Sequence, residues 1–76
     1  MNEEFDQLVG AMVADLIYKQ HVLRSQTQAN LDKVNNQASS ELSRMLIEDM
    51  KRTDHLIYVD TALSLTAQEH DAVKNQ

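Results

Sequence analysis

Apolar residues in the first part of the chain recur at intervals of three and four positions, which is the spacing of one face of an α-helix. At about 100° per residue they form a stripe roughly 180° wide, much broader than the ~100° apolar face of an ordinary surface helix. The pattern predicts a helix over about residues 3–34 that one neighbouring helix cannot cover. The stripe consists of Phe5, Leu8, Val9, Met12, Val13, Leu16, Ile17 and Leu23.

A second helix is predicted over about residues 40–65, and its apolar positions are spread even more widely around the axis. The residues of its first half cover roughly 200°, and those of its second half nearly encircle the helix. Thr66-Ala67-Gln68-Glu69 has the form of a capping box, so residues 66–76 are expected to form a short last helix or a frayed tail. The apolar positions are Leu42, Met45, Leu46, Ile47, Met50, Leu56, Ile57, Tyr58, Val59, Ala62, Leu63 and Leu65.

The polar middle, residues 24–41, can be read in two ways. As helix, Leu31, Val34 and Ala38 extend an a/d seam of the coiled-coil type to a bend near residues 35–40. As a linker, the same residues separate two shorter helices. The helix with a bend is the preferred interpretation. The N-cap of the second helix is then expected at one of three residues, Asn36, Ser39 or Ser40.

The tripeptide Leu-Ile-Tyr occurs twice, at residues 16–18 and 56–58. If the chain folds back near Gln37, two antiparallel helices bring Ile17 and Ile57 side by side. A short strand over residues 56–59 is the alternative for the second copy, because Ile, Tyr and Val favour sheets. The first copy lies within a helical pattern without strand alternation, so the helical hairpin is preferred.

The composition supports an all-α protein. The 76 residues contain one glycine, no proline and no cysteine, so neither the turns of a sheet nor disulfide bonds are available. A chain of this length forms one small domain, residues 1–76, whose core alone seldom supplies more than about 3–5 kcal/mol. We therefore expect an antiparallel helical hairpin that pairs into a four-helix bundle, or that packs into a groove of another protein.

Charge and hydropathy indicate a soluble, cytoplasmic protein. No apolar run approaches the ~18 residues of a membrane-spanning helix, and the amino terminus lacks the cationic region of a secretory signal. Residues 1–15 carry −4, residues 16–53 carry +2 and residues 54–76 carry −3, which makes the total −5. A hairpin places both acidic segments at one pole. Direct binding of nucleic acid is not expected, because the basic residues are interspersed with acids.

The chain shows no motif for catalysis, for a cofactor or for a metal ion, so we expect no enzyme activity. Its three histidines, His21, His55 and His70, lack the spacing of zinc ligands and are expected at the surface. The serines lack the setting of a nucleophile, and a thin hairpin is not expected to hold a cavity of the ~300 Å³ that ligand pockets need.

Two functions fit these features. The first is a small acidic interaction module, a homodimer, that regulates or inhibits a larger protein through its apolar stripes, where methionines such as Met45 adapt to different partners. The alternative is a structural or assembly subunit that binds only copies of itself. Partner identity is beyond what the residues indicate. The predicted interface consists of Met12, Leu16, Ile17, Tyr18, Leu46, Met50, Leu56, Ile57, Tyr58 and Leu63.

Overall fold

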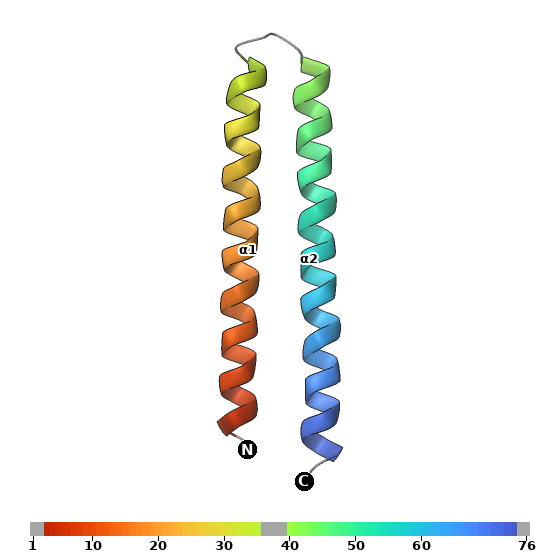
Figure 1. Cartoon of the computed structure of the whole chain (residues 1–76). Helices are drawn as coiled ribbons and strands as arrows, with labels where there is room; N and C mark the ends of the chain where they lie inside the picture. Colours follow the sequence, from red (N-terminus) through yellow and green to blue (C-terminus); the bar gives the residue numbers. More distant parts are fainter. Residues whose placement is uncertain (1–2, 36–39, 75–76) are drawn as a thin grey trace.

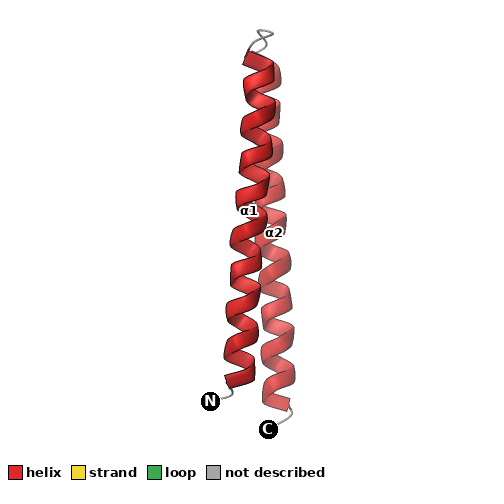
Figure 2. Cartoon of the chain, turned by 60° about the vertical axis from the view of Figure 1, so that its left-hand side comes forward, coloured by secondary structure: helices red, strands yellow, loops and turns green. Residues whose placement is uncertain are grey.

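The protein is an all-helical hairpin. The computed structural model describes residues 3–35 and 40–74, and two long helices account for all of them: α1 (Glu3–Asn35) and α2 (Ser40–Lys74). The helices run antiparallel and lie side by side along their whole length, with both chain termini at one end (Figure 1). The molecule measures 58 × 16 × 10 Å between Cα extremes, so it is a slender rod only one helix layer thick, as the turned view also shows (Figure 2). The prediction of an all-α antiparallel hairpin is confirmed.

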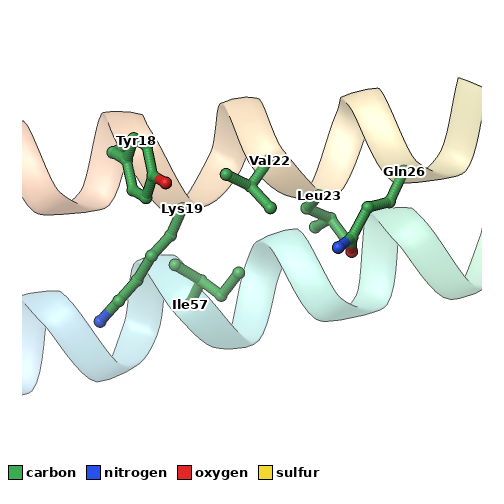
Figure 3. A pocket seen from close by; sticks show the side chains of 6 residues that line it. All are labelled: Tyr18, Lys19, Val22, Leu23, Gln26 and Ile57. Carbon is green, nitrogen blue, oxygen red and sulfur yellow. The ribbon is translucent and has the colours of Figure 1, made fainter.

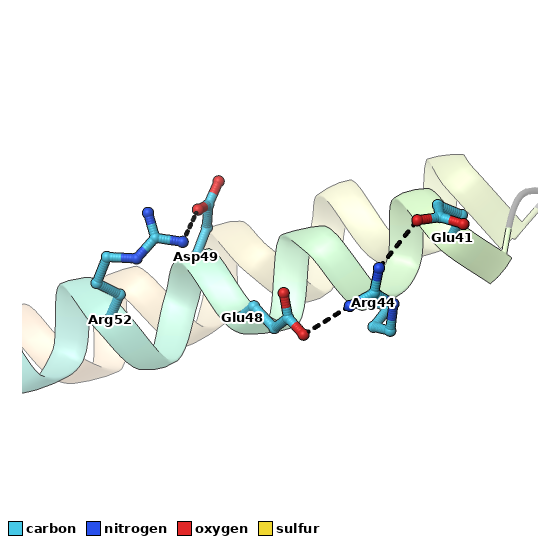
Figure 4. Close-up of polar contacts among 5 residues, drawn as sticks. All are labelled: Glu41, Arg44, Glu48, Asp49 and Arg52. Carbon is cyan, nitrogen blue, oxygen red and sulfur yellow. Dashed lines mark hydrogen bonds and ion pairs between the residues drawn. The ribbon is translucent and has the colours of Figure 1, made fainter.

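Local features of the sequence stabilise each helix by itself. Acidic residues occupy the first turn of α1, and Lys33 and Lys74 lie in the last turns of the two helices, where each charge opposes the helix dipole. An ion pair one turn apart joins Asp15 to Lys19 at 2.8 Å on α1. On α2, similar pairs join Arg44 to Glu41 and Glu48, and Arg52 to Asp49, at 2.8–2.9 Å (Figure 4). Exposed pairs of this kind stabilise a protein only weakly.

The helices meet along a seam, which we define as the row of partly buried side chains that each helix turns toward the other. On α1 the seam positions lie four, three and four residues apart, so that the row repeats every 11 residues; α2 follows the same repeat. An 11-residue repeat corresponds to about 3.67 residues per turn, instead of the 3.5 of the predicted a/d seam. The seam residues are Phe5, Val9, Met12, Leu16, Gln20, Leu23, Thr27, Leu31 and Val34 on α1, and Ser43, Leu46, Met50, Asp54, Ile57, Thr61 and Leu65 on α2.

Several predictions about the helix boundaries need correction. Residues 24–35 are helix, so the linker interpretation is wrong there. Residues 56–59 lie within α2, so the alternative strand is also wrong, and α2 continues to Lys74 without a separate tail. The Thr66 hydroxyl donates a hydrogen bond of 2.9 Å to the carbonyl of Ala62, as in a helix interior, and not to the start of a new helix.

The predicted bend near residues 35–40 falls largely on residues 36–39, which lie outside the described residues, together with the N-cap candidates Asn36 and Ser39 and the seam candidate Ala38. Ser40 is the first residue of α2.

The two helices are offset by about one turn from the predicted register. Arg24 of α1 pairs with Asp54 of α2 at 3.5 Å, and Ile57 lies against the α1 segment that holds Tyr18, Lys19, Val22 and Leu23. Ile17 is therefore not level with Ile57, and the predicted pairing of these two residues is wrong by about one turn, which is about 5.4 Å along the axis. The two Leu-Ile-Tyr copies still lie near each other, since Tyr18 of the first and Ile57 of the second line the same depression.

Candidate interaction surface

The seam buries very little. Val34, with 9% of its surface exposed, is the one buried apolar residue in the part of the chain that the structure describes, and Thr27 is the one buried polar residue. The Thr27 hydroxyl donates to the carbonyl of Leu23 at 2.9 Å, which satisfies it within its own helix. Within the two described helices, eleven large apolar side chains stay exposed, namely Leu8, Val13, Ile17, Tyr18, Leu42, Met45, Ile47, Leu56, Tyr58, Leu63 and Val73. The expectation that one neighbouring helix cannot cover the stripes is thus met.

One side of the hairpin carries a shallow hollow, and we call it the hollow flank. Five residues of α1 and Ile57 of α2 line a depression of about 330 Å³ that is open to solvent (Figure 3). No cavity of the ~300 Å³ that ligand pockets need was expected from the sequence. The hollow exceeds that volume, so the expectation is wrong, but the hollow is an open groove and not an enclosed pocket. Its α1 residues are Tyr18, Lys19, Val22, Leu23 and Gln26.

Further apolar residues extend the hollow flank along both helices. The charge of Asp60 acts on Lys19, which places Asp60 on this side of α2. Leu56 and Leu63, four and three residues from Asp60, lie on the same face of the helix. The 11-residue repeat brings Met45 onto the face of Leu56. The hollow flank therefore presents exposed apolar groups over most of its length.

The opposite side carries the Arg24–Asp54 ion pair, and we call it the ion-pair flank. On α1, Ile17 lies two turns before Arg24 and Val13 one turn earlier still; on α2, Tyr58 lies one turn after Asp54. One carboxylate oxygen of Asp54, Oδ2, accepts the guanidinium hydrogen bond, while Oδ1 is shielded from solvent and has no hydrogen-bond partner. This flank thus mixes exposed apolar groups with a charge pair that bridges the two helices.

Lys19, at the edge of the hollow, has a perturbed pKa. A hydrogen bond from its ammonium group to Asp15 at 2.8 Å is the largest cause, followed by the charge of Asp15 and, more weakly, that of Asp60. These carboxylates favour the charged amine and raise the pKa above its ordinary value of 10.5, and desolvation opposes them in part. Lys19 is consequently a cation at neutral pH, with its aliphatic stem over the hollow.

The ten residues of the predicted interface fall into two groups. Met12, Leu16, Leu46, Met50 and Ile57 are partly buried in the seam between the helices of one chain, whereas the other five are exposed.

The exposed five are divided between the flanks. Tyr18, Leu56 and Leu63 lie on the hollow flank, and Ile17 and Tyr58 lie on the ion-pair flank. The two Leu-Ile-Tyr copies therefore present different faces, since Leu16 and Ile57 enter the seam while Ile17 and Leu56 remain outside.

The predicted interface also omits six exposed residues: Leu8, Val13, Leu42, Met45, Ile47 and Val73. The 11-residue recurrence in the seam, which is visible in the sequence, would have separated most of these outward positions from the seam positions. The hollow depends on the register of the two helices, and no signal within either helix predicts it.

No other chemistry is concentrated on the described surface. His21, His55 and His70 are all exposed. Over residues 3–35 and 40–74, no three His, Cys, Asp or Glu side chains lie close enough together to hold a metal ion. Neither of the two helices, as far as they are described, is long and apolar enough to cross a bilayer.

Comparison with known proteins finds no match: no protein-family model, no curated protein sequence and no solved structure is similar to this chain.

Proposed function

We propose that the hairpin is a small acidic protein–protein interaction module that pairs with a second copy into a four-helix bundle and regulates or inhibits a larger partner protein. The observation that carries this proposal is the large exposed apolar surface on both flanks, combined with a seam that buries a single apolar residue among those described. Contiguous apolar surface of this kind marks interaction sites in proteins.

The total surface area supports pairing. The chain exposes 6027 Å², whereas a compact monomer of its mass, 8.7 kDa, exposes only about 4,700 Å². The excess is about 1,300 Å² per chain, so two chains that covered it would bury about 2,600 Å² in total. That area lies within the ~2,000–5,000 Å² typical of obligate homodimers.

Pairing of two hairpins leaves surface for a larger partner. When two flat hairpins stack, each covers one flank of the other, and the second flank of each faces outward. The uncovered flank still presents large apolar side chains, and both flanks of this hairpin do so. A regulator needs two such surfaces, one to complete its own fold and one to hold its target.

The alternative function is that of a self-assembling subunit with no separate target. It draws on the same observation, because two apolar flanks on opposite sides allow copies to stack in an open series instead of a closed dimer. The two functions differ in how size depends on concentration.

Light scattering coupled to size-exclusion chromatography, with circular dichroism on each peak, tests the proposal. We expect a strongly helical dimer whose mass stays constant over about a 100-fold range of concentration. Mass that grows steadily with concentration would favour the assembly subunit. A strongly helical monomer at every concentration would contradict the pairing on which both functions depend.

A further inference from the structure

We infer that the second copy covers the hollow flank and lies reversed, with its helix-joining end beside the termini of the first copy. This inference rests on the proposed pairing and adds the face and the direction of the contact. The occupant is a second copy of this chain because the excess area of one hairpin matches what a homodimer buries.

The two flanks differ in the free energy of removing their side chains from water. Covering the ion-pair flank would remove the Arg24–Asp54 pair from water, although its contact is long, at 3.5 Å, and Asp54 Oδ1 already has no partner. Desolvation of such a poorly arranged pair costs more than the pair returns. The hollow flank offers apolar walls at Val22 and Ile57, with Lys19 and Gln26 beside them. Its neighbours Leu56 and Leu63 are 60% and 65% exposed, so their burial is favourable.

The position of the hollow suits a symmetric contact. It lies near mid-length of both helices, between Tyr18 and Gln26 on α1 and beside Ile57 on α2 (Figure 3). Consider a two-fold axis that runs between the stacked copies, perpendicular to the helices, at the level of the hollow. It turns the second copy end over end and brings the hollows of the two copies against each other. The projecting ring of Tyr18 then lies across the hollow of the partner copy.

The direction follows from the distribution of charge along the hairpin. In the half that contains the termini, residues 3–18 and 60–74 carry seven carboxylates and one lysine, a net charge of −6. In the other half, residues 19–35 and 40–59 carry six basic and five acidic side chains, a net charge of +1. Copies aligned in the same direction would bring two strongly acidic halves together. Reversed copies place each acidic half beside a weakly basic one, which lowers the repulsion.

A matched pair of substitutions tests the flank. Leu56 on the hollow flank and Ile17 on the ion-pair flank are both 60% exposed and both lie inside long helices. We expect Leu56→Asp to raise the dissociation constant of the dimer by roughly 100-fold or more, because symmetry buries the new carboxylate twice. Ile17→Asp is expected to change the dissociation constant by less than about threefold, because Ile17 stays exposed to water in the dimer. Sedimentation equilibrium measures both values, and circular dichroism reports the helix content. The reverse ranking would overturn the choice of flank.

Spin labels test the direction without disturbing the hollow flank. The chain has no cysteine, so Ser40→Cys and Gln7→Cys each provide a single attachment site, at the helix-joining end and near the termini respectively; both positions are exposed. Distances between the two labels of a dimer are measured by double electron–electron resonance. At 1.5 Å per residue, reversed copies place the Ser40 labels roughly 50 Å apart and the Gln7 labels roughly 40 Å apart. Copies aligned in the same direction place each pair within about 25 Å, the width of a four-helix bundle.

The reversed arrangement and the pairing itself can fail separately. Short distances in a stable dimer would overturn the reversed arrangement and leave the pairing intact. A chain that stays monomeric at every concentration would overturn the pairing itself, and would leave the hollow flank to a different protein. The label distances also remain informative if Leu56→Asp fails to fold, because they are measured on chains with an unaltered flank.

Discussion

At the scale of single residues, the two flanks differ mainly in how their charges are held. Lys19 forms its ion pair within α1, one turn from Asp15, so it follows its own helix wherever that helix packs. Arg24 pairs across the seam with Asp54 and so depends on the register of the two helices. The hydrogen bond and charge of Asp15 raise the pKa of Lys19.

We expect the pKa of Lys19 to lie above 10.5 in the native protein and to fall toward that value in Asp15→Asn, because the hydrogen bond and charge of Asp15 are the main causes of the shift. A raised pKa means that the folded chain holds the proton more tightly. The resulting stabilisation is complete below the unfolded value and is lost as the pH rises through the folded value, in the strongly alkaline range. Nuclear magnetic resonance titration of the Lys19 side chain measures the shift. Lys51 provides the control, since an equal change there would show that the effect is not local.

At the scale of the element, each helix is stabilised by its own sequence more than by its neighbour. The seam of α1 contains Gln20 and Thr27, and that of α2 contains Ser43, Asp54 and Thr61, so polar groups interrupt the apolar contact on both sides. Within a single hairpin, helix propensity and short-range pairs therefore carry more of the helix stability than they do in proteins with an apolar core. Substitutions that alter propensity alone should have measurable effects.

Gly10 is the clearest such position. It lies inside α1, where glycine costs about 0.5–1 kcal/mol relative to alanine. A Cβ atom placed there meets nothing within 4 Å apart from the adjoining residues and backbone of its own helix. Gly10→Ala is therefore expected to raise the free energy of unfolding by about 0.5–1 kcal/mol, as measured by urea denaturation followed by circular dichroism. The matched control is Ala14→Gly, one turn further on at another exposed position, which should lower it by a similar amount. Loss of stability in Gly10→Ala would mean that another chain approaches the backbone there.

At the scale of the whole molecule, the hairpin is too thin to hold a core. Its smallest dimension is 10 Å between Cα extremes, and no described side chain is fully buried. Two helices alone can only shield the strip between them, whereas four helices enclose a space that is apolar on all sides. Stability should therefore come from association.

The midpoint of thermal unfolding should accordingly rise with protein concentration, since a dimer that dissociates on unfolding is favoured by mass action. Circular dichroism melts over about a 100-fold range of concentration measure this dependence. Leu56→Asp serves as the control, because a chain that no longer pairs should melt at one temperature throughout. A midpoint of the native chain that does not move would mean that a single hairpin is stable alone.

Much of the fold was predictable because helix formation is local. The three- and four-residue spacing of apolar positions and the absence of proline act within a few residues of one another, and they correctly indicated two long helices in a hairpin. The prediction of a separate tail at Thr66 was wrong, because a four-residue motif describes little of the chain. Leu31 and Val34 lie in the seam as predicted, but the seam repeats every 11 residues and not every seven.

The sequence by itself determined that each helix has more apolar surface than one neighbour can cover, because the angular width of a stripe depends only on residue spacing. The tertiary structure decided which part of that surface is covered. The register depends on the packing of the whole seam, summed over both helices, and an offset of one turn changes the neighbours of every side chain. That offset separated Ile17 from Ile57, paired Arg24 with Asp54 and opened the hollow beside Val22, none of which either helix encodes alone.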